Sequence, residues 1–396
     1  MKLVQTFVWT FLFAAAFASP AAFAIKVQTG NDDFLLNINV LAQARAVADF
    51  DGPPYNATMT QGQAPDGSFN TDFYVRRMRL GAGGTLYKTF HFFILFDTPN
   101  FGRRGDYTGS TFVQELVVGI EPVQDVIIEG GFLDTLLTHV QLARSAATSI
   151  IEGPAFAFDL LNNARGNRMT GVQTRTLLFD HRILVRGGVY EGRRNYTPPT
   201  TYKGAPVVVN PSGVPLFAAM IRLNLVGDET SSGYPGIYLD GKTRVSLGAA
   251  AHYQRKGSWI PDAQGNPQGV ADYRVQAADL FADFALPGDM EAVLQVAGYR
   301  FDYGKNAAGN GSARSGIGAA GDIGYRIGKI EPQANFYWFN SDTKQNSYMR
   351  LAAGVNYFFH GHDAKLCAEF SSTINNGNLS STPALKEIIL QYQIAL

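Results

Sequence analysis

The sequence predicts an all-β protein, a transmembrane antiparallel β-barrel of about sixteen strands. Three observations predict it. Segments of about 10–15 residues alternate apolar and polar side chains along most of the chain. The chain has 42 glycines, 28 phenylalanines and 18 tyrosines, yet a mean hydropathy of −0.06. Finally, residues 73–97 contain an aromatic strand face, and before it Tyr74, Met78 and Leu80 form an outer apolar face opposite Arg77 and Arg79. Within this stretch no acidic residue appears before Asp97 to neutralise the arginines. Unpaired charge is costly in a dry core but is tolerated beside water.

Residues 1–24 have the pattern of a secretory signal peptide. Lys2 is their only charge, an apolar run extends from Val4 to Phe17, and a small-x-small cleavage site ends at Ala24. A membrane-spanning helix is the alternative, but the run is short and lacks a flanking cluster of charges. We therefore expect residues 25–396 to form one exported barrel domain, located in the outer membrane of a Gram-negative bacterium.

The charge balance excludes one class of partner. The chain has 33 basic and 33 acidic residues, and loss of Lys2 with the signal leaves one net negative charge. This balance predicts no nucleic-acid partner. The single cysteine, Cys367, cannot form an internal disulfide, and we expect it to be a small apolar side chain on a strand.

The strands are expected in a regular order. Residues 34–50 alternate throughout and form the first strand, and residues 73–97 contain the next two. The remaining strands are expected at 111–121, 124–133, 168–179, 182–192, 214–226, 242–254, 272–286, 290–303, 315–328, 330–340, 347–360, 364–372 and 386–396. Short periplasmic turns are expected at 180–181, 287–289 and 361–363, and long external loops at 51–72, 193–213, 227–241, 255–271 and 304–314.

Residues 134–165 interrupt this order of strands and connections. The segment is too apolar for a solvated external loop, and a loop of more than about fifteen residues in a compact domain is usually functional or disordered. We expect it to fold into the barrel and narrow a pore. The alternative is an extracellular loop packed on a neighbouring subunit.

Arginines are the candidate functional residues. Arg45, Arg77 and Arg79 fall on inward positions of adjacent strands, and Arg76 lies near their loop side. Successive guanidinium groups, which are permanently charged forked donors, can pass an anion from site to site. The other candidates lie in or beside the inserted segment: Arg144, Arg165 and Arg168. In the alternative interpretation the arginines only stabilise a wet lumen by pairing with carboxylates, namely Glu115, Glu129, Glu152 and Asp159.

Several short motifs resemble the phosphate-selective porin O and P family. They are Phe73-x-x-Arg76-Arg77-x-Arg79 before glycines and an aromatic strand, Gly130-Gly131-Phe132, and Ser149-Ile150-Ile151-Glu152 leading to Arg165-Gly166-Asn167-Arg168-x-x-Gly171-Val172. The resemblance implies an outer-membrane porin that passes phosphate or polyphosphate through an arginine-lined, water-filled pore and assembles as a homotrimer beside outer-membrane lipid. Barrels of this class usually end in phenylalanine, whereas this chain ends in Leu396.

Other motifs predict no enzyme, cofactor or metal. Gly316, Gly318 and Gly321 match a dinucleotide fingerprint, but strand alternation continues through them where the fingerprint needs a helix. His360 and His362 lie at a turn without a third convergent ligand. The competing functions are a non-selective general porin, a structural or adhesive barrel closed by residues 134–165, and a barrel hydrolase; a soluble all-β protein is the competing fold.

Overall fold

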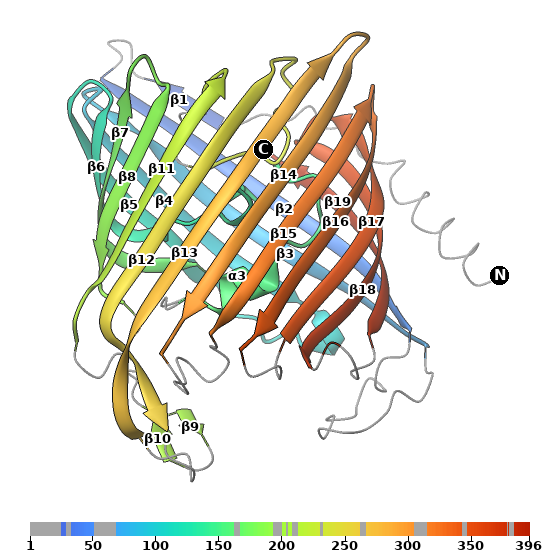
Figure 1. Cartoon of the computed structure of the whole chain (residues 1–396). Helices are drawn as coiled ribbons and strands as arrows, with labels where there is room; N and C mark the ends of the chain where they lie inside the picture. Colours follow the sequence, from blue (N-terminus) through green and yellow to red (C-terminus); the bar gives the residue numbers. More distant parts are fainter. Residues whose placement is uncertain are drawn as a thin grey trace.

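The computed structural model describes residues 25–28, 33–50, 69–161, 167–192, 200–202, 205–207, 213–229, 233–261, 267–304, 315–342, 347–377, 379 and 384–396. In this part of the chain, sixteen antiparallel strands form a closed barrel (Figure 1). Fifteen of its strand pairs join neighbours in the order β2 to β8 and β11 to β19, and β19 then pairs with β2 to close the ring. The predicted fold class is confirmed.

The strands agree closely with the predicted ranges. They are β2 (Phe34–Phe50), β3 (Phe69–Leu86), β4 (Phe90–Phe101), β5 (Phe112–Val123), β6 (Val126–Asp134), β7 (Arg168–Leu178), β8 (Ile183–Tyr190), β11 (Leu216–Val226), β12 (Arg244–Pro261), β13 (Pro267–Leu286), β14 (Met290–Asp302), β15 (Gly316–Ile327), β16 (Ile330–Ser341), β17 (Ser347–His360), β18 (Ala364–Gly377) and β19 (Leu385–Ala395). Outside the ring, β1 (Ile25–Gln28) pairs with the first half of β2, and β9 (Thr200–Tyr202) pairs with β10 (Ala205–Val207).

Side-chain alternation along each strand separates an outer apolar face from an inner polar one. In β11, Phe217 and Ile221 are exposed on the outside, whereas Met220 and Arg222 are buried inside. In β19, Gln391 and Gln393 face inward. This is the pattern of a barrel with an apolar outside. No helix in the described part of the chain is long and apolar enough to cross a bilayer.

The two ends of the barrel differ in their connections. Short turns at 87–89, 124–125, 179–182, 287–289, 328–329 and 361–363 lie at one end, together with the end of β19. The opposite end carries the longer connections, and we call it the loop end (Figure 1). The predicted turns at 180–181, 287–289 and 361–363 are therefore placed as expected. Residues 1–24 and most of the predicted loops 51–72, 193–213 and 304–314 lie outside the described residues.

Two predicted external loops were wrong. Most of residues 255–271 belong to a long hairpin in which β12 and β13 extend beyond the neighbouring strands, with a register shift between Gln254 and Ser258. Residues 227–241 follow β11, which runs from the loop end to the turn end, so this connection lies at the turn end. Its length suggested an external loop, but strand direction decides the side.

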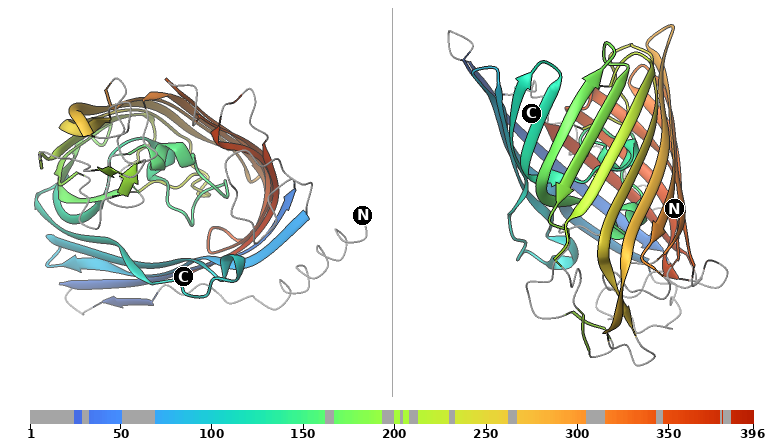
Figure 2. Two further views of the ribbon diagram at one scale, coloured as in Figure 1. Left: turned by 90° about the horizontal axis from the view of Figure 1, so that it is seen from below. Right: turned by 60° about the vertical axis from the view of Figure 1, so that its left-hand side comes forward.

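Two segments occupy the interior. Residues 135–161, the first inserted segment, enter from the loop end and include α2 (His139–Leu142) and α3 (Ala155–Asp159). They reach strands across the lumen, because Asn356 Nδ2 donates to Ser149 O at 2.6 Å and Gln393 Nε2 donates to Ala146 O at 2.8 Å. Figure 2 shows this segment within the ring of strands.

The second inserted segment is residues 227–243, of which 227–229 and 233–243 are described. It folds inward from the turn end and meets the first segment. Arg144 N donates to Tyr234 O at 2.8 Å and Gly236 N donates to Ala147 O at 2.8 Å. An isolated parallel bridge joins Ala143 to Tyr234. Backbone therefore enters the lumen from both ends.

An apolar core lies inside the barrel between the first segment and the wall from β11 to β17. Phe156 of α3 packs against the rings of Tyr299, Phe339 and Tyr348. A β-carbon at Gly318 would lie 2.5 Å from the Phe156 ring, so this glycine makes room for the inserted segment. Gly316, Gly318 and Gly321 lie in strand β15, which explains the fingerprint match without a nucleotide site.

Candidate solute pathway

The arginine row on β3 is shaped by a β-bulge. Gln43 of β2 pairs with Arg77 and the next residue, Ala44, pairs with Val75, which leaves Arg76 as the extra residue. A bulge changes which side chains share a face. Arg76 Nε donates to Glu152 and Arg77 Nη1 donates to Gln43 Oε1, so both guanidinium groups face the lumen.

The bulge also corrects the prediction for Tyr74. Tyr74 was expected on the outer face with Met78 and Leu80, but it is buried inside with Val47 and Ile151, because the bulge inverts the alternation before Arg76. Strict period-two alternation could not predict this result.

Glu152 of the first inserted segment is the anionic partner of this row. Arg45 pairs with its carboxylate and also donates to Gln391 Oε1 at 2.6 Å, while Arg76 Nε lies 3.3 Å from it. Burial alone would raise the pKa of the Glu152 carboxyl, but the charges of Arg45, Arg76 and Arg77 together hold that pKa well below its usual range. Glu152 is therefore ionised at neutral pH and fixes the inserted segment to the wall.

Further along the wall, basic and acidic groups alternate. Arg79 Nε donates to Asp97 Oδ2 at 2.9 Å, and its Nη1 donates to Ser145 Oγ of the first segment at 3.1 Å. Arg168 Nη2 lies 3.2 Å from both Glu115 and Asp134. Arg175 lies 4.0 Å from Glu129. We use the name charged wall for the charged residues of this row, which are Arg76, Arg77, Arg79, Asp97, Glu115, Glu129, Asp134, Glu152, Arg168 and Arg175.

Access to solvent distinguishes the charged wall from the rest of the lumen. The side chains of Arg76, Arg79, Glu115, Asp134 and Arg168 remain 14–21% exposed. Two ion pairs on the opposite wall are dry, with 0–4% exposure: Arg222 with Asp279, and Arg350 with Glu369. Partly exposed charge inside a barrel needs water beside it. The charges along β3 to β7 therefore face accessible space, whereas these two pairs are covered.

Arg77 differs from its neighbours in lacking an anionic partner. Within the described residues its hydrogen bond is to the neutral Gln43 amide at 2.9 Å, and no carboxylate lies within ion-pair distance of it. Gln43 is itself held by Gln393 Oε1 at 2.7 Å and by Ser145 O at 3.3 Å. A fixed guanidinium without an anionic partner keeps donors available to an anion.

The other arginines predicted to line the pathway lie in different places. Arg144 is exposed in the first segment, and its side chain lies beside Gly233 of the second. Arg168 lies on the charged wall. Arg165 lies outside the described residues. The sequence alternative, pairing with Glu115, Glu129 and Glu152, describes most of the arginines on the wall.

Sequence reasoning missed some members of the wall. Arg175 lies on the inner face of β7 beside Gln173, and Asp134 ends β6 opposite Arg168. The alternation of Gln173 and Arg175 with Val172 and Thr174 was a usable signal. Ser145 carried no such signal, because its place depends on how the inserted segment crosses the lumen.

A cavity of about 190 Å³ opens at the loop end of this wall. Its lining includes Arg45, Arg76 and Glu152 from the wall and segment, and Arg103 from the short helix η1 (Arg103–Gly105). Asp49 and Glu387, which are directly opposed across β2 and β19, complete its acidic side. The entrance to the wall is therefore lined by both signs of charge. Among the described residues no group of three His, Cys, Asp or Glu side chains could hold a metal ion.

No protein-family model matches the sequence, and no curated protein matches it. Solved structures of outer-membrane proteins do match. The high-pH structure of Pseudomonas putida OprB has a TM-score of 0.61 at 9% identity, over 90% of this chain and 94% of that chain. The outer membrane channel DcaP of Acinetobacter baumannii has a TM-score of 0.58 at 12% identity, over 93% and 99% of the two chains.

The anion-selective porin from Comamonas acidovorans has a TM-score of 0.57 at 11% identity, over 92% of this chain and 100% of that chain. The chain has the fold of the outer-membrane porins. At these identities the likeness establishes the fold. The relationship to the phosphate-selective O and P family, inferred from short motifs, stays a prediction.

Proposed function

We propose that the chain is a porin of the Gram-negative outer membrane, through which small solutes diffuse passively along the charged wall. The observation that carries the proposal is the contrast in exposure between the partly accessible ion pairs of β3 to β7 and the dry pairs Arg222–Asp279 and Arg350–Glu369. A sixteen-stranded barrel is wide enough to hold a water-filled path. The names of its structural neighbours, which include a channel and an anion-selective porin, agree with this function.

We further propose that the path favours anions, with phosphate or polyphosphate as the candidate solute. Arg77 has no carboxylate partner, and Arg45, Arg76 and Arg79 surround it. Arg144 is exposed on the first inserted segment, and we assign it to the same path together with Arg165 and Arg168. Forked guanidinium donors match phosphate oxygens, and focusing by fixed charges needs neither chemistry nor energy coupling.

A general porin with weak selectivity is the second candidate, and a specific observation favours it. Arg79, Arg168 and Arg175 each have a carboxylate within 4.0 Å, so much of the wall is close to electrically neutral. Such a wall attracts ions of either sign much less than an unpaired row. In that case the selectivity depends on Arg77 and the groups beside it.

The reversal potential of the purified protein in a planar bilayer under a potassium chloride gradient separates these candidates. An anion pore gives a chloride-side reversal, and added phosphate blocks the chloride current. A general porin gives a reversal near zero and no phosphate block. Absence of any conductance from correctly folded protein would contradict both and favour a structural or adhesive barrel.

We propose that the mature chain assembles as a homotrimer. We also propose that residues 1–24 are a signal peptide that directs export of the chain. One structural neighbour, OmpT of Vibrio cholerae, is described in a trimer form, with a TM-score of 0.53 at 10% identity. Native mass measurement in detergent tests the stoichiometry. Amino-terminal sequencing of the membrane-inserted protein tests cleavage before Ile25.

A further inference from the structure

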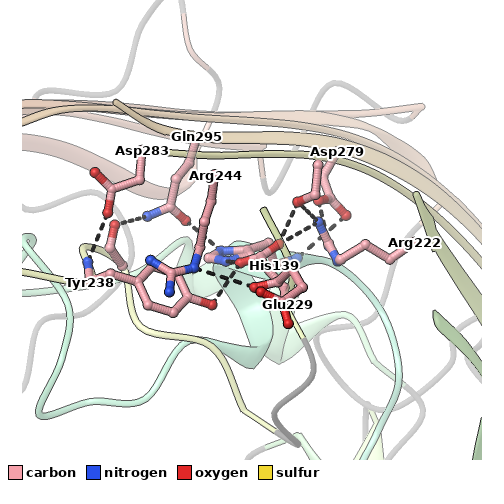
Figure 3. A network of polar contacts seen from close by, with 11 residues as sticks. His139, Arg222, Glu229, Tyr238, Arg244, Asp279, Asp283 and Gln295 are labelled. Atoms are coloured by element: carbon pink, nitrogen blue, oxygen red, sulfur yellow. Dashed lines mark hydrogen bonds and ion pairs between the residues drawn. The ribbon is translucent and has the colours of Figure 1, made fainter. Parts of the chain in front are cut away.

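The second inserted segment is fastened in the lumen by a buried network of charges (Figure 3). Glu229 of this segment lies 2.8 Å from His139 Nε2 of α2 and 3.6 Å from Arg222 of β11. Arg222 donates to Asp279 Oδ1 of β13 at 2.7 Å. Ser246 of β12 also donates to Glu229. All four charged side chains are essentially inaccessible to solvent.

The hydrogen-bond geometry fixes the orientation of the His139 ring. Gln295 Nε2 donates to Gly236 O at 3.1 Å, so its Oε1 faces His139 Nδ1 at 3.1 Å. His139 Nε2 faces the Glu229 carboxylate. Both ring nitrogens therefore face oxygen atoms. His139 and Arg222 lie against Glu229 and Asp279, so each buried carboxylate has a hydrogen-bonding partner, as a dry interior requires.

Aromatic contacts complete the attachment. The His139 ring stacks on Tyr234 of the second segment at 4.7 Å and on Phe281 of β13 at 3.9 Å. Tyr238 donates its hydroxyl to Glu229 Oε1 at 3.0 Å, and its backbone N–H donates to Asp283 Oδ2 at 2.9 Å. The first segment, the second segment and the wall from β11 to β14 thus form one packed unit.

We infer that the second inserted segment is a brace that determines where solutes pass. It holds residues 135–161 against β11 to β14, which closes that side of the lumen and leaves the charged wall as the conducting side. The Arg144 N–H is bonded to Tyr234 O, so the brace also places Arg144 on that path. The location of the conducting side and the placement of Arg144 on the path rest on the proposed porin function. The attachment of the two segments does not.

The test compares Glu229→Gln with a matched variant, Asp240→Asn. Breaking a buried pair costs about 3–5 kcal/mol, so Glu229→Gln should speed amide exchange at Arg144 and Gly236 by about a hundredfold or more. It should also raise single-channel conductance and open-channel noise. Asp240 lies on the same segment, but it is more than a third exposed, and its ion pair is with Arg244 at 2.8 Å. Asp240→Asn should change neither exchange nor conductance.

A milder variant allows the same test if Glu229→Gln does not fold. Tyr238→Phe removes one hydrogen bond to Glu229 and keeps the ring on which the Arg244 guanidinium lies, 3.8 Å from its centroid. Loss of about 1 kcal/mol should speed exchange at Arg144 and Gly236 roughly five- to tenfold.

Each outcome has a distinct meaning. Unchanged exchange in residues 135–161 of both Glu229→Gln and Tyr238→Phe would overturn the attachment. Faster exchange with unchanged conductance and selectivity would overturn the role in confining the path. Faster exchange in a protein that never conducts would support the attachment and contradict the porin function separately.

Discussion

Arg76 and Arg77 are adjacent in sequence, yet both point into the lumen, because the β2 to β3 ladder skips Arg76 between Gln43 and Ala44. Their environments nevertheless differ. Arg76 is paired with Glu152 of the inserted segment, whereas Arg77 donates to the neutral Gln43 amide. One bulge therefore gives two adjacent arginines different roles: Arg76 attaches the inserted segment to the wall, and Arg77 keeps a charge that no carboxylate neutralises.

Arg77→Gln should reduce the preference for anions without unfolding the barrel. A unit charge about 7 Å from a permeating ion in water contributes about 0.6 kcal/mol, attractive for an anion and repulsive for a cation, so the anion-to-cation permeability ratio should fall about sevenfold. Reversal potentials in a salt gradient measure this ratio. Arg300→Gln is the control, because Arg300 is an exposed residue near the loop end that pairs with Asp342 at 2.9 Å. An equal fall in both variants would contradict a special role for Arg77.

Glu152→Gln should change selectivity in the opposite direction. It removes the carboxylate shared by Arg45 and Arg76 and leaves three uncompensated guanidinium groups beside the path. The anion-to-cation permeability ratio should rise about sevenfold by the same Coulomb argument. Because Arg45 is buried, its unpaired charge should also lower the free energy of unfolding by about 3 kcal/mol or more. If Arg77→Gln and Glu152→Gln shift reversal in the same direction, charge is not the cause.

The fold and the residue types of the site could be predicted from sequence for a physical reason. Each strand has one face in apolar surroundings and one beside polar groups, so alternation gives its position and orientation locally, as in β11 and β19. The same rule placed Tyr74 on the wrong face, because a bulge is decided by pairing with β2 and leaves no mark in β3 alone. Which arginines have partners also depends on where residues 135–161 cross the lumen.

Gly318→Ala should destabilise the inserted segment through Phe156. The added β-carbon would lie 2.5 Å from the ring, and overpacking of this kind costs about 1–3 kcal/mol. Amide exchange within α3 and the thermal midpoint by circular dichroism measure the loss. Gly298→Ala on the neighbouring β14 is the control, since nothing lies within 4 Å of a β-carbon there. In a Phe156→Leu background, Gly318→Ala should destabilise the protein less. An equal loss of stability in both backgrounds would show that the added β-carbon does not clash with Phe156.

The second inserted segment illustrates the limit of sequence reasoning. Glu229, Tyr234 and Tyr238 lie in a connection whose composition indicates a polar loop. Their partners, His139, Arg222 and Asp279, come from three other elements as far as 90 residues away in sequence. Burial of the carboxylate becomes favourable only when both cations are present, which is a property of the assembled lumen.

Acid should release this segment in a defined pH range. Burial opposes ionisation of Glu229, but the charge and hydrogen bond of His139, with Arg222 and Ser246, lower its pKa to about 2. A depressed pKa means that the released state binds the proton first, so the stabilisation is complete above about pH 4.5 and is lost as the pH falls toward 2. The loss amounts to roughly 3 kcal/mol. Open-channel noise should therefore rise steeply below about pH 4. Glu229→Gln should be noisy already at pH 7 and should lack the acid step, because the titrating group is gone. Other lumen carboxylates titrate in both proteins, so the difference between them isolates Glu229, and an identical acid step in both would refute its assignment.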